Sequence, residues 1–223
     1  MSKRKKCPDR RRTALRRCAW LAAILLFLAV TKLYTPLPGM AVAEAADVCD
    51  VKNPEVVDWF YDGTLPITRF SLHALVDGER SMMLTAVTFN PLAGGWYYRT
   101  FSEAEAWDGS GLYAGVYQHG QDEKNVGYLF GRIDDPNIVS VELTETVQAV
   151  LVPESGLHPD DEVTLPVTLK TEPIVERNGG RYLLAEMELR AEPYSTRGFQ
   201  LTGYDAEGNA VVTIEPYWRY WHT

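Results

Sequence analysis

The sequence predicts a mainly β protein whose antiparallel strands form a sandwich or an open barrel. Three observations lead to this class. Hydrophobic residues recur with a period of two over most of the second half, and clusters of Gly, Pro, Asn and Asp separate these segments. No long amphipathic helical pattern follows the first forty or so residues. The whole chain is 46% hydrophobic and 23% charged, a composition typical of folded globular proteins.

Charge divides the chain into two unequal parts. Before Glu44 there are ten Lys and Arg against one acidic residue, whereas the remainder carries twelve against twenty-nine. The two parts therefore have net charges of +9 and −17. Because the larger part would repel phosphate backbones, we expect no nucleic-acid binding.

The basic beginning is followed by an uncharged apolar run over residues 18–31. Fourteen such residues suit the core of a signal peptide better than a full membrane span. Ala41-Val42-Ala43 has the small side chains that signal peptidase accepts, which predicts cleavage after Ala43. The alternative is an uncleaved apolar helix that anchors the protein in the membrane through residues 18–34. In both cases the N-terminus stays in the cytoplasm and the rest is exported, to the cell surface or beyond it.

We therefore expect three segments. Residues 1–43 are a signal peptide or membrane anchor that contains the apolar leader helix. Residues 44–125 form a smaller β-rich region with one short helix, and residues 126–223 form the β-sandwich. The short helix is expected at residues 54–60, because Asn53 suits an N-cap and Pro54 the first helical position.

The smaller region contains four expected strands. Apolar residues alternate over residues 67–76, and Asp77-Gly78 supplies a tight turn before residues 82–89, which together predict a hairpin. Aromatic residues dominate residues 96–101, and residues 111–118 resume the strand pattern.

Two apolar runs within residues 126–143 flank the cluster Asp134-Asp135-Pro136-Asn137. This pattern predicts strand, turn and strand. The cluster offers oxygen atoms to a cation, yet it is too short to supply six ligands by itself. We interpret it as the turn that joins two strands of the sandwich.

The remaining strands are expected at residues 146–152, 163–175, 181–189, 199–204 and 210–214. Pro166 and Pro173 restrict the second of these to an edge or a bulged position. Asn178-Gly179-Gly180 predicts the turn before the third.

The run YLFGRIDDPNIVSVE at residues 128–142, with YDAEGN at residues 204–209, resembles small exported or membrane-anchored proteins of Gram-positive bacteria that have no assigned function. The resemblance covers about residues 126–215. It implies an immunoglobulin-like sandwich from about Val126 onward, and it transfers no catalytic or binding residue.

Catalytic and metal-binding patterns are missing from the sequence. The four histidines stand singly, so no zinc signature occurs. Ser110 and Ser155 lack the surroundings of a nucleophile elbow. Cys49 is the only cysteine after the leader, so it has no partner there for a disulfide. We expect a protein that is not an enzyme and needs no metal or cofactor.

Aromatic residues are the main candidates for binding. Exposed rings commonly hold sugars, and the candidates are Trp96, Trp107, Trp218 and Trp221. Packing in the core explains the same residues and is the favoured interpretation. We therefore expect an exported cell-envelope protein that acts by binding or structural interaction, with envelope proteins or glycans as partners. The alternative is a carbohydrate-binding or cell-wall-hydrolysing accessory protein that uses exposed aromatic residues.

Overall fold

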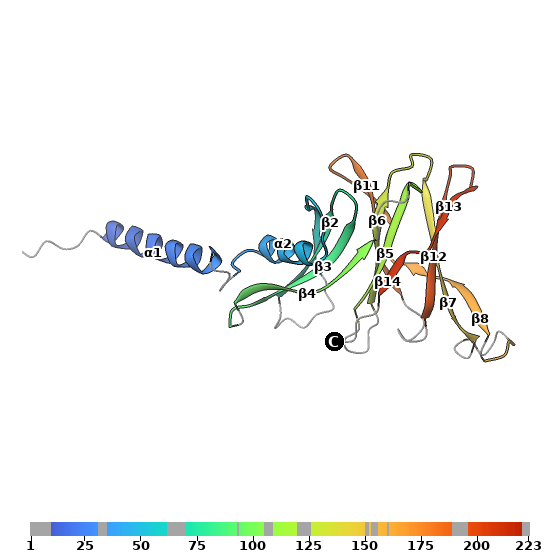
Figure 1. Ribbon diagram of the computed structural model, residues 1–223, viewed down its shortest axis with the longest axis horizontal. Helices are drawn as coiled ribbons and strands as arrows, with labels where there is room; N and C mark the ends of the chain where they lie inside the picture. The colour runs from blue at the N-terminus through green and yellow to red at the C-terminus, as the bar shows by residue number, and fades with distance from the viewer. Residues whose placement is uncertain are drawn as a thin grey trace, which may run out of the picture.

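The computed structural model describes residues 10–30, 35–61, 70–92, 94–104, 109–119, 126–149, 152, 156–159, 161–188 and 196–219. These residues form two helices and fourteen strands, and the strands make three open sheets (Figure 1). Among the described strands, the pair of β14 with β5 is parallel and all other pairs are antiparallel. The predicted mainly β, antiparallel class is confirmed.

Sheet A contains β1 (Glu55–Phe60), β2 (Phe70–Asp77), β3 (Met82–Asn90) and β4 (Gly95–Ala104), in chain order. Sheet B has the order β10-β11-β6-β5-β14, with β9 added beside β11. Its strands are β5 (Leu112–His119), β6 (Val126–Ile133), β9 (Thr168–Leu169), β10 (Ile174–Arg177), β11 (Gly180–Glu188) and β14 (Tyr217–Arg219). Sheet C has the order β13-β12-β7-β8. Its strands are β7 (Ser140–Gln148), β8 (Glu162–Pro166), β12 (Thr196–Tyr204) and β13 (Ala210–Ile214).

Helix α2 (Pro38–Val48) covers one face of sheet A. Its buried side chains, Ala41, Val42, Ala45 and Ala46, are at most 2% exposed. They pack against the side chains of Ala74 and Met83 in sheet A. Small residues spaced one helical turn apart allow the helix to approach the sheet closely, so α2 forms the first layer of a stack.

The opposite face of sheet A packs against sheet B. Leu75 and Leu84 from sheet A share a buried cluster with Tyr128, Phe130 and Tyr182 from sheet B. Both faces of sheet A are therefore covered. This explains why all the first seven residues of β3 are buried, where a strand with one wet face would alternate.

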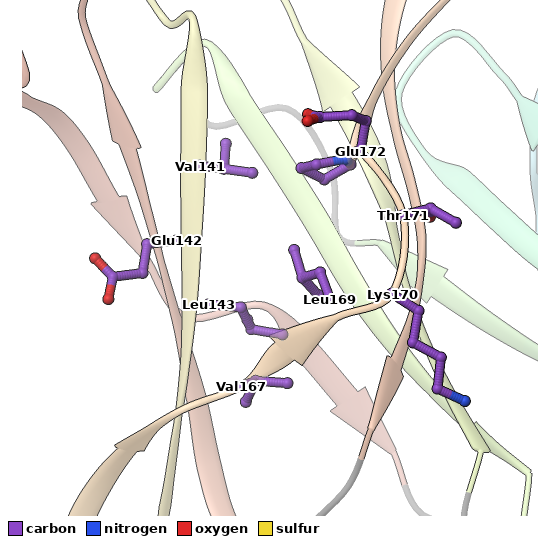
Figure 2. Close-up of a pocket in the computed structure, with 9 residues that line it drawn as sticks. Val141, Glu142, Leu143, Val167, Leu169, Lys170, Thr171 and Glu172 are labelled. Atoms are coloured by element: carbon purple, nitrogen blue, oxygen red, sulfur yellow. The ribbon is translucent and has the colours of Figure 1, made fainter.

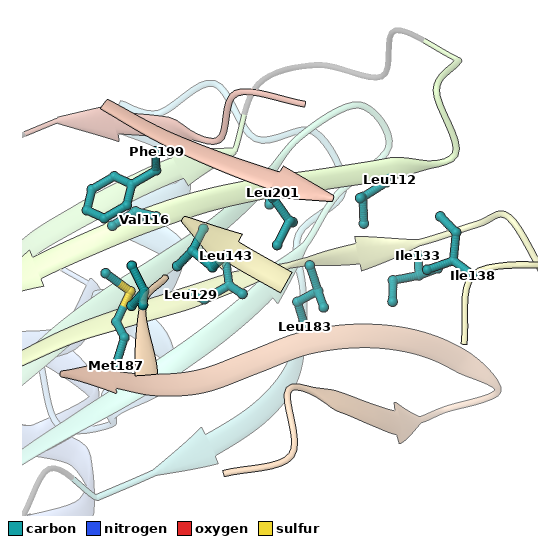
Figure 3. Close-up of a cluster of buried hydrophobic side chains, with 12 residues drawn as sticks. Leu112, Val116, Leu129, Ile133, Ile138, Leu143, Leu183, Met187, Phe199 and Leu201 are labelled. Atoms are coloured by element: carbon teal, nitrogen blue, oxygen red, sulfur yellow. The ribbon is translucent and has the colours of Figure 1, made fainter. Parts of the chain in front are cut away.

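A third apolar layer lies between sheets B and C. Leu129 and Leu183 of sheet B meet Leu143, Phe199 and Leu201 of sheet C (Figure 3). The order of layers is thus α2, sheet A, sheet B and sheet C, which Figure 1 shows along the long axis of the molecule. Strand β5 precedes residue 125 yet pairs with β6 along its whole length.

The expected short helix at residues 54–60 is wrong, because Glu55–Phe60 form strand β1. Asn53 has a φ of 49°, in the left-handed region, instead of the extended backbone of an N-cap. Val56, Trp59 and Phe60 are β-branched or aromatic, and they pair with β2 in sheet A. Tertiary pairing overrode the local capping pattern.

The expected long strand at residues 163–175 is also wrong, because it is three short strands. Pro166 ends β8 in sheet C, and after Val167 the chain enters sheet B as β9. Pro173 directly precedes β10, the edge strand of that sheet. The two prolines thus mark breaks at which the chain changes partners.

The other described hairpins agree with the sequence. Strands β2 and β3 pair as expected, and β10 pairs with β11 across the predicted turn. The strands expected at residues 199–204 and 210–214 pair with each other as β12 and β13. Asn178 and Gly179 have φ values of 49° and 77°, which is the backbone of the tight turn that the sequence indicated.

Helix α1 (Arg10–Val30) precedes the sheets and exposes most of its large apolar side chains. Within the described ranges, no helix combines the length and apolarity needed to cross a membrane.

Candidate binding site

The site begins where the chain crosses from sheet C to sheet B. The pairing of β8 with β7 runs from Glu162 opposite Gln148 to Pro166 opposite Thr144. One further bond extends it, because the Val167 N–H donates to the Leu143 carbonyl over 2.9 Å. Strand β9 then pairs with β11 instead. The sheets separate at Val167.

Among the described strands, this crossing leaves one edge of β7 open. Residues 140–142 pair with β12 on one side, whereas the pairing with β8 ends at Thr144 and Leu143. Along a strand, successive residues direct their N–H and C=O groups to alternate sides. Because the Leu143 carbonyl faces β8, the main chain of Val141 faces the same open side. The first three residues of β7 are therefore a short free strand edge, at which the main chain of Val141 points outward.

A cavity of about 480 Å³ lies beside this edge (Figure 2). Its walls come from β7 and from the segment that leads through β9 to β10. They are Val141, Glu142, Leu143, Val167, Leu169, Lys170, Thr171, Glu172 and Pro173. The side chains of Val141, Leu143 and Leu169 face the hollow, whereas Glu142 points to the other side of β7. The volume is in the range of ordinary ligand sites.

Charged groups around the cavity are mostly acidic. The Lys170 ammonium forms an ion pair with Glu186 on β11, so its charge is already compensated. Glu142 accepts a hydrogen bond of 3.0 Å from the Tyr204 hydroxyl, and this bond raises the pKa of Tyr204. Glu172 adds a second carboxylate to the rim. The open edge of β7 thus lies between two acidic side chains.

The tryptophans expected as candidates lie elsewhere or are not described. Trp96 is partly buried in the cluster beneath α2, with its ring centroid 5.4 Å from that of Phe89. Trp218 belongs to β14, but the position of its side chain is not described. Trp107 and Trp221 lie outside the described residues. No described contact brings these four residues together.

His73 lies in the contact between sheets A and B. It is 1% exposed, and its ring stacks on Phe60 with centroids 5.1 Å apart and an angle of 12°. Tyr117 and Tyr128 lie against the same ring at 5.8 and 5.3 Å. The imidazole therefore packs as an aromatic ring inside a core.

A polar cluster lies at the border of the same contact. The Asp77 Oδ2 atom accepts a hydrogen bond of 3.0 Å from the Tyr182 hydroxyl and one of 3.2 Å from Arg132 Nη1. Burial raises the pKa of the Asp77 carboxyl, and the bonds from Tyr182 and Arg132 oppose this effect. Burial also raises the pKa of Tyr182, to about 12, with help from the nearby Asp77 charge. These groups join sheets A and B.

The acidic cluster that the sequence offered for a cation serves its own turn, and Asp205 does the same in the turn between β12 and β13. Asp135 Oδ1 accepts a hydrogen bond of 2.8 Å from the Asn137 N–H. Asp205 accepts bonds of 2.7 and 3.0 Å from the N–H groups of Asn209 and Glu207, and Asn209 lowers the pKa of Asp205. Across the described part of the chain, no three His, Cys, Asp or Glu side chains are grouped to hold a metal ion.

Comparison with known proteins gives no relative. No protein-family model, no curated protein and no solved structure matches this chain.

The cavity has no signature in the sequence. It is formed by a strand that changes sheets, and its apolar lining residues look like ordinary core positions. Pro166 and Pro173, seven positions apart on either side of β9, are the one signal that could have indicated it.

Proposed function

We propose that this chain is an exported cell-envelope protein that acts by non-enzymatic binding, and that the cavity beside β7 is its binding site. In this proposal sheets B and C form an immunoglobulin-like sandwich. The observation that carries the proposal is the free edge of β7 next to an apolar cavity of about 480 Å³. Main-chain groups supply affinity for an added strand, while a pocket selects its side chains.

The register of β7 indicates the partner's chemistry. A strand added at this edge would place one side chain near Val141, over the cavity, and the next near Glu142. Apolar residues suit the first position, and Lys or Arg suits the second, because opposite charges on neighbouring strands attract. We therefore propose an extended protein segment with alternating apolar and basic residues.

The proposal that the protein is exported is supported by the N-terminal part of the chain. Its charge of +9 before Glu44, followed by the apolar run, supports export with a cytoplasmic N-terminus. Two contacts support the uncleaved alternative, with residues 18–34 anchored in the membrane. Ala41 and Val42 are at most 2% exposed under sheet A, and Thr35 pairs with Gly95 at the start of β4. Cleavage after Ala43 would remove all of these contacts.

A direct test uses the full chain in lipid nanodiscs and measures binding of three probes. One is an octapeptide of alternating Lys and Val, the second alternates Glu and Val, and the third is a hexamer of N-acetylglucosamine. We expect the basic peptide to bind at least about tenfold more tightly than the acidic one, a difference of about 1.4 kcal/mol. Equal binding of both peptides, or binding of the sugar alone, would overturn the proposal.

Variants locate the site. Leu169→Trp fills the cavity, and the matched control Thr164→Trp adds the same ring at an exposed position of β8. We expect about tenfold weaker binding of the basic peptide to the first variant and unchanged binding to the second. Glu142→Lys, at an exposed position, reverses a rim charge without touching the core and should weaken binding in the same way. If both site variants bind like the unmodified chain, the cavity is not the site.

A further inference from the structure

The sheet A end of the molecule is joined to the leader by a short connection. Helix α1 ends at Val30, and Thr35 is already held by β4, so only residues 31–34 lie between them. The Thr35 N–H donates to the Gly94 carbonyl over 2.7 Å, and the Trp96 N–H donates to the Thr35 carbonyl over 2.8 Å. Even fully extended, five residue steps span roughly 18 Å. If the apolar leader is in a membrane, this end of sheet A lies beside it.

The two segments that meet at this point carry no charge. Neither residues 35–43 nor residues 81–98 contain a single Asp, Glu, Lys or Arg. The contrast with the rest of the exported part is large, because that part has twenty-nine acidic residues. Acidic surfaces are repelled by the negatively charged headgroups of a bilayer, so these two segments can approach it more closely than acidic segments can.

Apolar side chains are exposed at the same point. Leu92, two residues before Gly94 in the turn between β3 and β4, is 97% exposed. Leu37, two residues after Thr35, is 61% exposed, and Tyr97 is 37% exposed. An isolated exposed leucine is common, but here three apolar or aromatic side chains lie within two residues of one pair of hydrogen bonds. Tyrosine at such a position is typical of membrane interfaces.

The position of the β3–β4 turn in the molecule also places it on the side of the leader. In Figure 1 the turn between β3 and β4 points toward the end of α1, whereas β8 and β13 lie at the opposite end. Val211 on β13 is also an exposed apolar residue, at 38%, but its hairpin contains Asp205 and Glu207. It therefore provides a matched position far from the leader.

We propose that the uncharged corner of sheet A around the Thr35–Gly95 bridge, which exposes Leu37, Leu92 and Tyr97, rests on the lipid bilayer as a second membrane contact. This inference rests on the membrane anchor of the proposed function. It differs from that proposal because an anchor alone would leave the folded part free to point in any direction. The second contact fixes its orientation and sets sheet C farthest from the membrane.

The experiment uses the full chain in nanodiscs that contain anionic lipid. Cys7, Cys18 and Cys49 are replaced by Ser, and one cysteine is introduced by Leu92→Cys or, as the control, by Val211→Cys. Each cysteine carries a fluorophore that is sensitive to its environment, and the nanodiscs contain lipid with a spin label near the top of the acyl chain. We expect the label at position 92 to shift to shorter wavelength and to be quenched at least about twofold more than the label at position 211.

The outcomes separate the two proposals. If the chain elutes without lipid, the proposed anchor is wrong, and the second membrane contact that depends on it is wrong as well. If the chain stays with the nanodisc but both labels are quenched equally, the anchor stands and the second contact is overturned. As a further measurement, Leu92→Asp should abolish the difference in quenching between Tyr97→Cys and Val211→Cys variants while retention in the nanodisc is unchanged.

Discussion

Arg132 of β6 and Asp77 of β2 join two sheets through one hydrogen-bonded ion pair, with Arg132 Nη1 3.2 Å from Asp77 Oδ2. The two residues are fifty-five positions apart in the chain. Arg132 also binds Asp134 through Nε at 2.7 Å, so the guanidinium is fixed on both sides. The pair is partly shielded from water, since the side chains are 33% and 14% exposed. The contact between sheets A and B therefore combines an apolar core with a polar border.

Removing the Tyr182 hydroxyl should weaken this border. Tyr182→Phe deletes the 3.0 Å hydrogen bond to Asp77, whose carboxylate then loses a donor in a partly buried place. We expect a loss of about 1 to 2 kcal/mol in the free energy of unfolding, measured by urea denaturation. Tyr204→Phe is the matched control, because it deletes a hydrogen bond of 3.0 Å on the exposed outer side. A loss of the same size in both variants would contradict a special role for the border.

The raised pKa of Asp77 predicts a dependence of stability on pH. Because burial raises this pKa in the folded state above 3.8, the folded chain holds a proton that the unfolded chain has already lost. The contribution of Asp77 to stability is therefore fully present at lower pH and is lost as the pH rises through the folded pKa. We expect the stability of Asp77→Asn, measured against the unmodified chain in urea at pH 4 to 7, to improve as the pH rises. A relative stability that falls with pH would show that the bond to Arg132 outweighs burial.

Tyr182 should be visible in an alkaline titration. Its pKa of about 12 means that the folded chain keeps this proton after the unfolded chain begins to lose it near 10. Stability from Tyr182 is thus present below pH 10 and lost as the pH rises toward 12. Ultraviolet absorbance of the phenolate should show a late component that is missing in Tyr182→Phe. A titration unchanged by that substitution would contradict the assignment.

Helix α2 offers a matched pair of substitutions. Ala45 is 0% exposed beneath sheet A, whereas Ala43, two positions earlier on the same helix, is exposed. Ala45→Asp places an unpaired charge in the core and should cost about 3 kcal/mol or more. Ala43→Asp should change the free energy of unfolding by less than about 0.5 kcal/mol. Equal effects, measured by thermal denaturation, would mean that α2 does not pack on sheet A.

A second matched pair concerns two glycines in strands. A Cβ atom on Gly131 would lie 2.0 Å from the Tyr113 carbonyl oxygen, where β5 and β6 approach closely, so Gly131→Ala must push the strands apart. We expect a loss of about 3 kcal/mol. A Cβ atom on Gly198 meets nothing within 4 Å. Gly198→Ala should be neutral or stabilise the chain by up to about 1 kcal/mol, and a reversed order in urea denaturation would contradict the close approach.

The N-terminus of the exported protein is the last prediction. Because Ala41 and Val42 are buried under sheet A and Thr35 pairs with Gly95, we expect the chain to remain uncut at Ala43. Mass spectrometry of the protein from membrane fractions should find peptides that cross position 43. A mature protein that begins at Glu44 in the culture medium would contradict this expectation.

Local patterns in the sequence predicted most strands of the fold. The hairpin predicted around Asp77-Gly78 and the turn at Asn178-Gly179 depend on neighbouring residues, and both were confirmed. The sequence also indicated strands on both sides of Asp134, but not that β6 and β7 would belong to different sheets. Pairing between distant strands is decided by packing of the whole chain, which a local pattern does not contain.

Two segments show why predictions from local sequence patterns failed. Asn53 and Pro54 resemble a helix start, yet the pairing of β1 with β2 stabilises a strand more than the capping pattern stabilises a helix. Helix α2 was missed because its residues up to Ala43 were assigned to the leader. Its signal was present, since Pro38 suits a first helical turn and Ala41, Val42, Ala45 and Ala46 recur at helical spacing. The cavity beside β7 was indicated only by the spacing of Pro166 and Pro173, because it arises where Val167 leaves sheet C.

The order of the layers determines how far the cavity lies from the sheet A end. Each sheet packed on another adds about 10 Å of height, so α2 and sheets A, B and C together act as a stiff spacer. The cavity lies in the outer part of this column, between β7 and β9, and not at its base. A protein fixed at the sheet A end would hold its open strand edge at a constant height above the lipid. Partners would then be selected by where their extended segments are found as well as by their sequence.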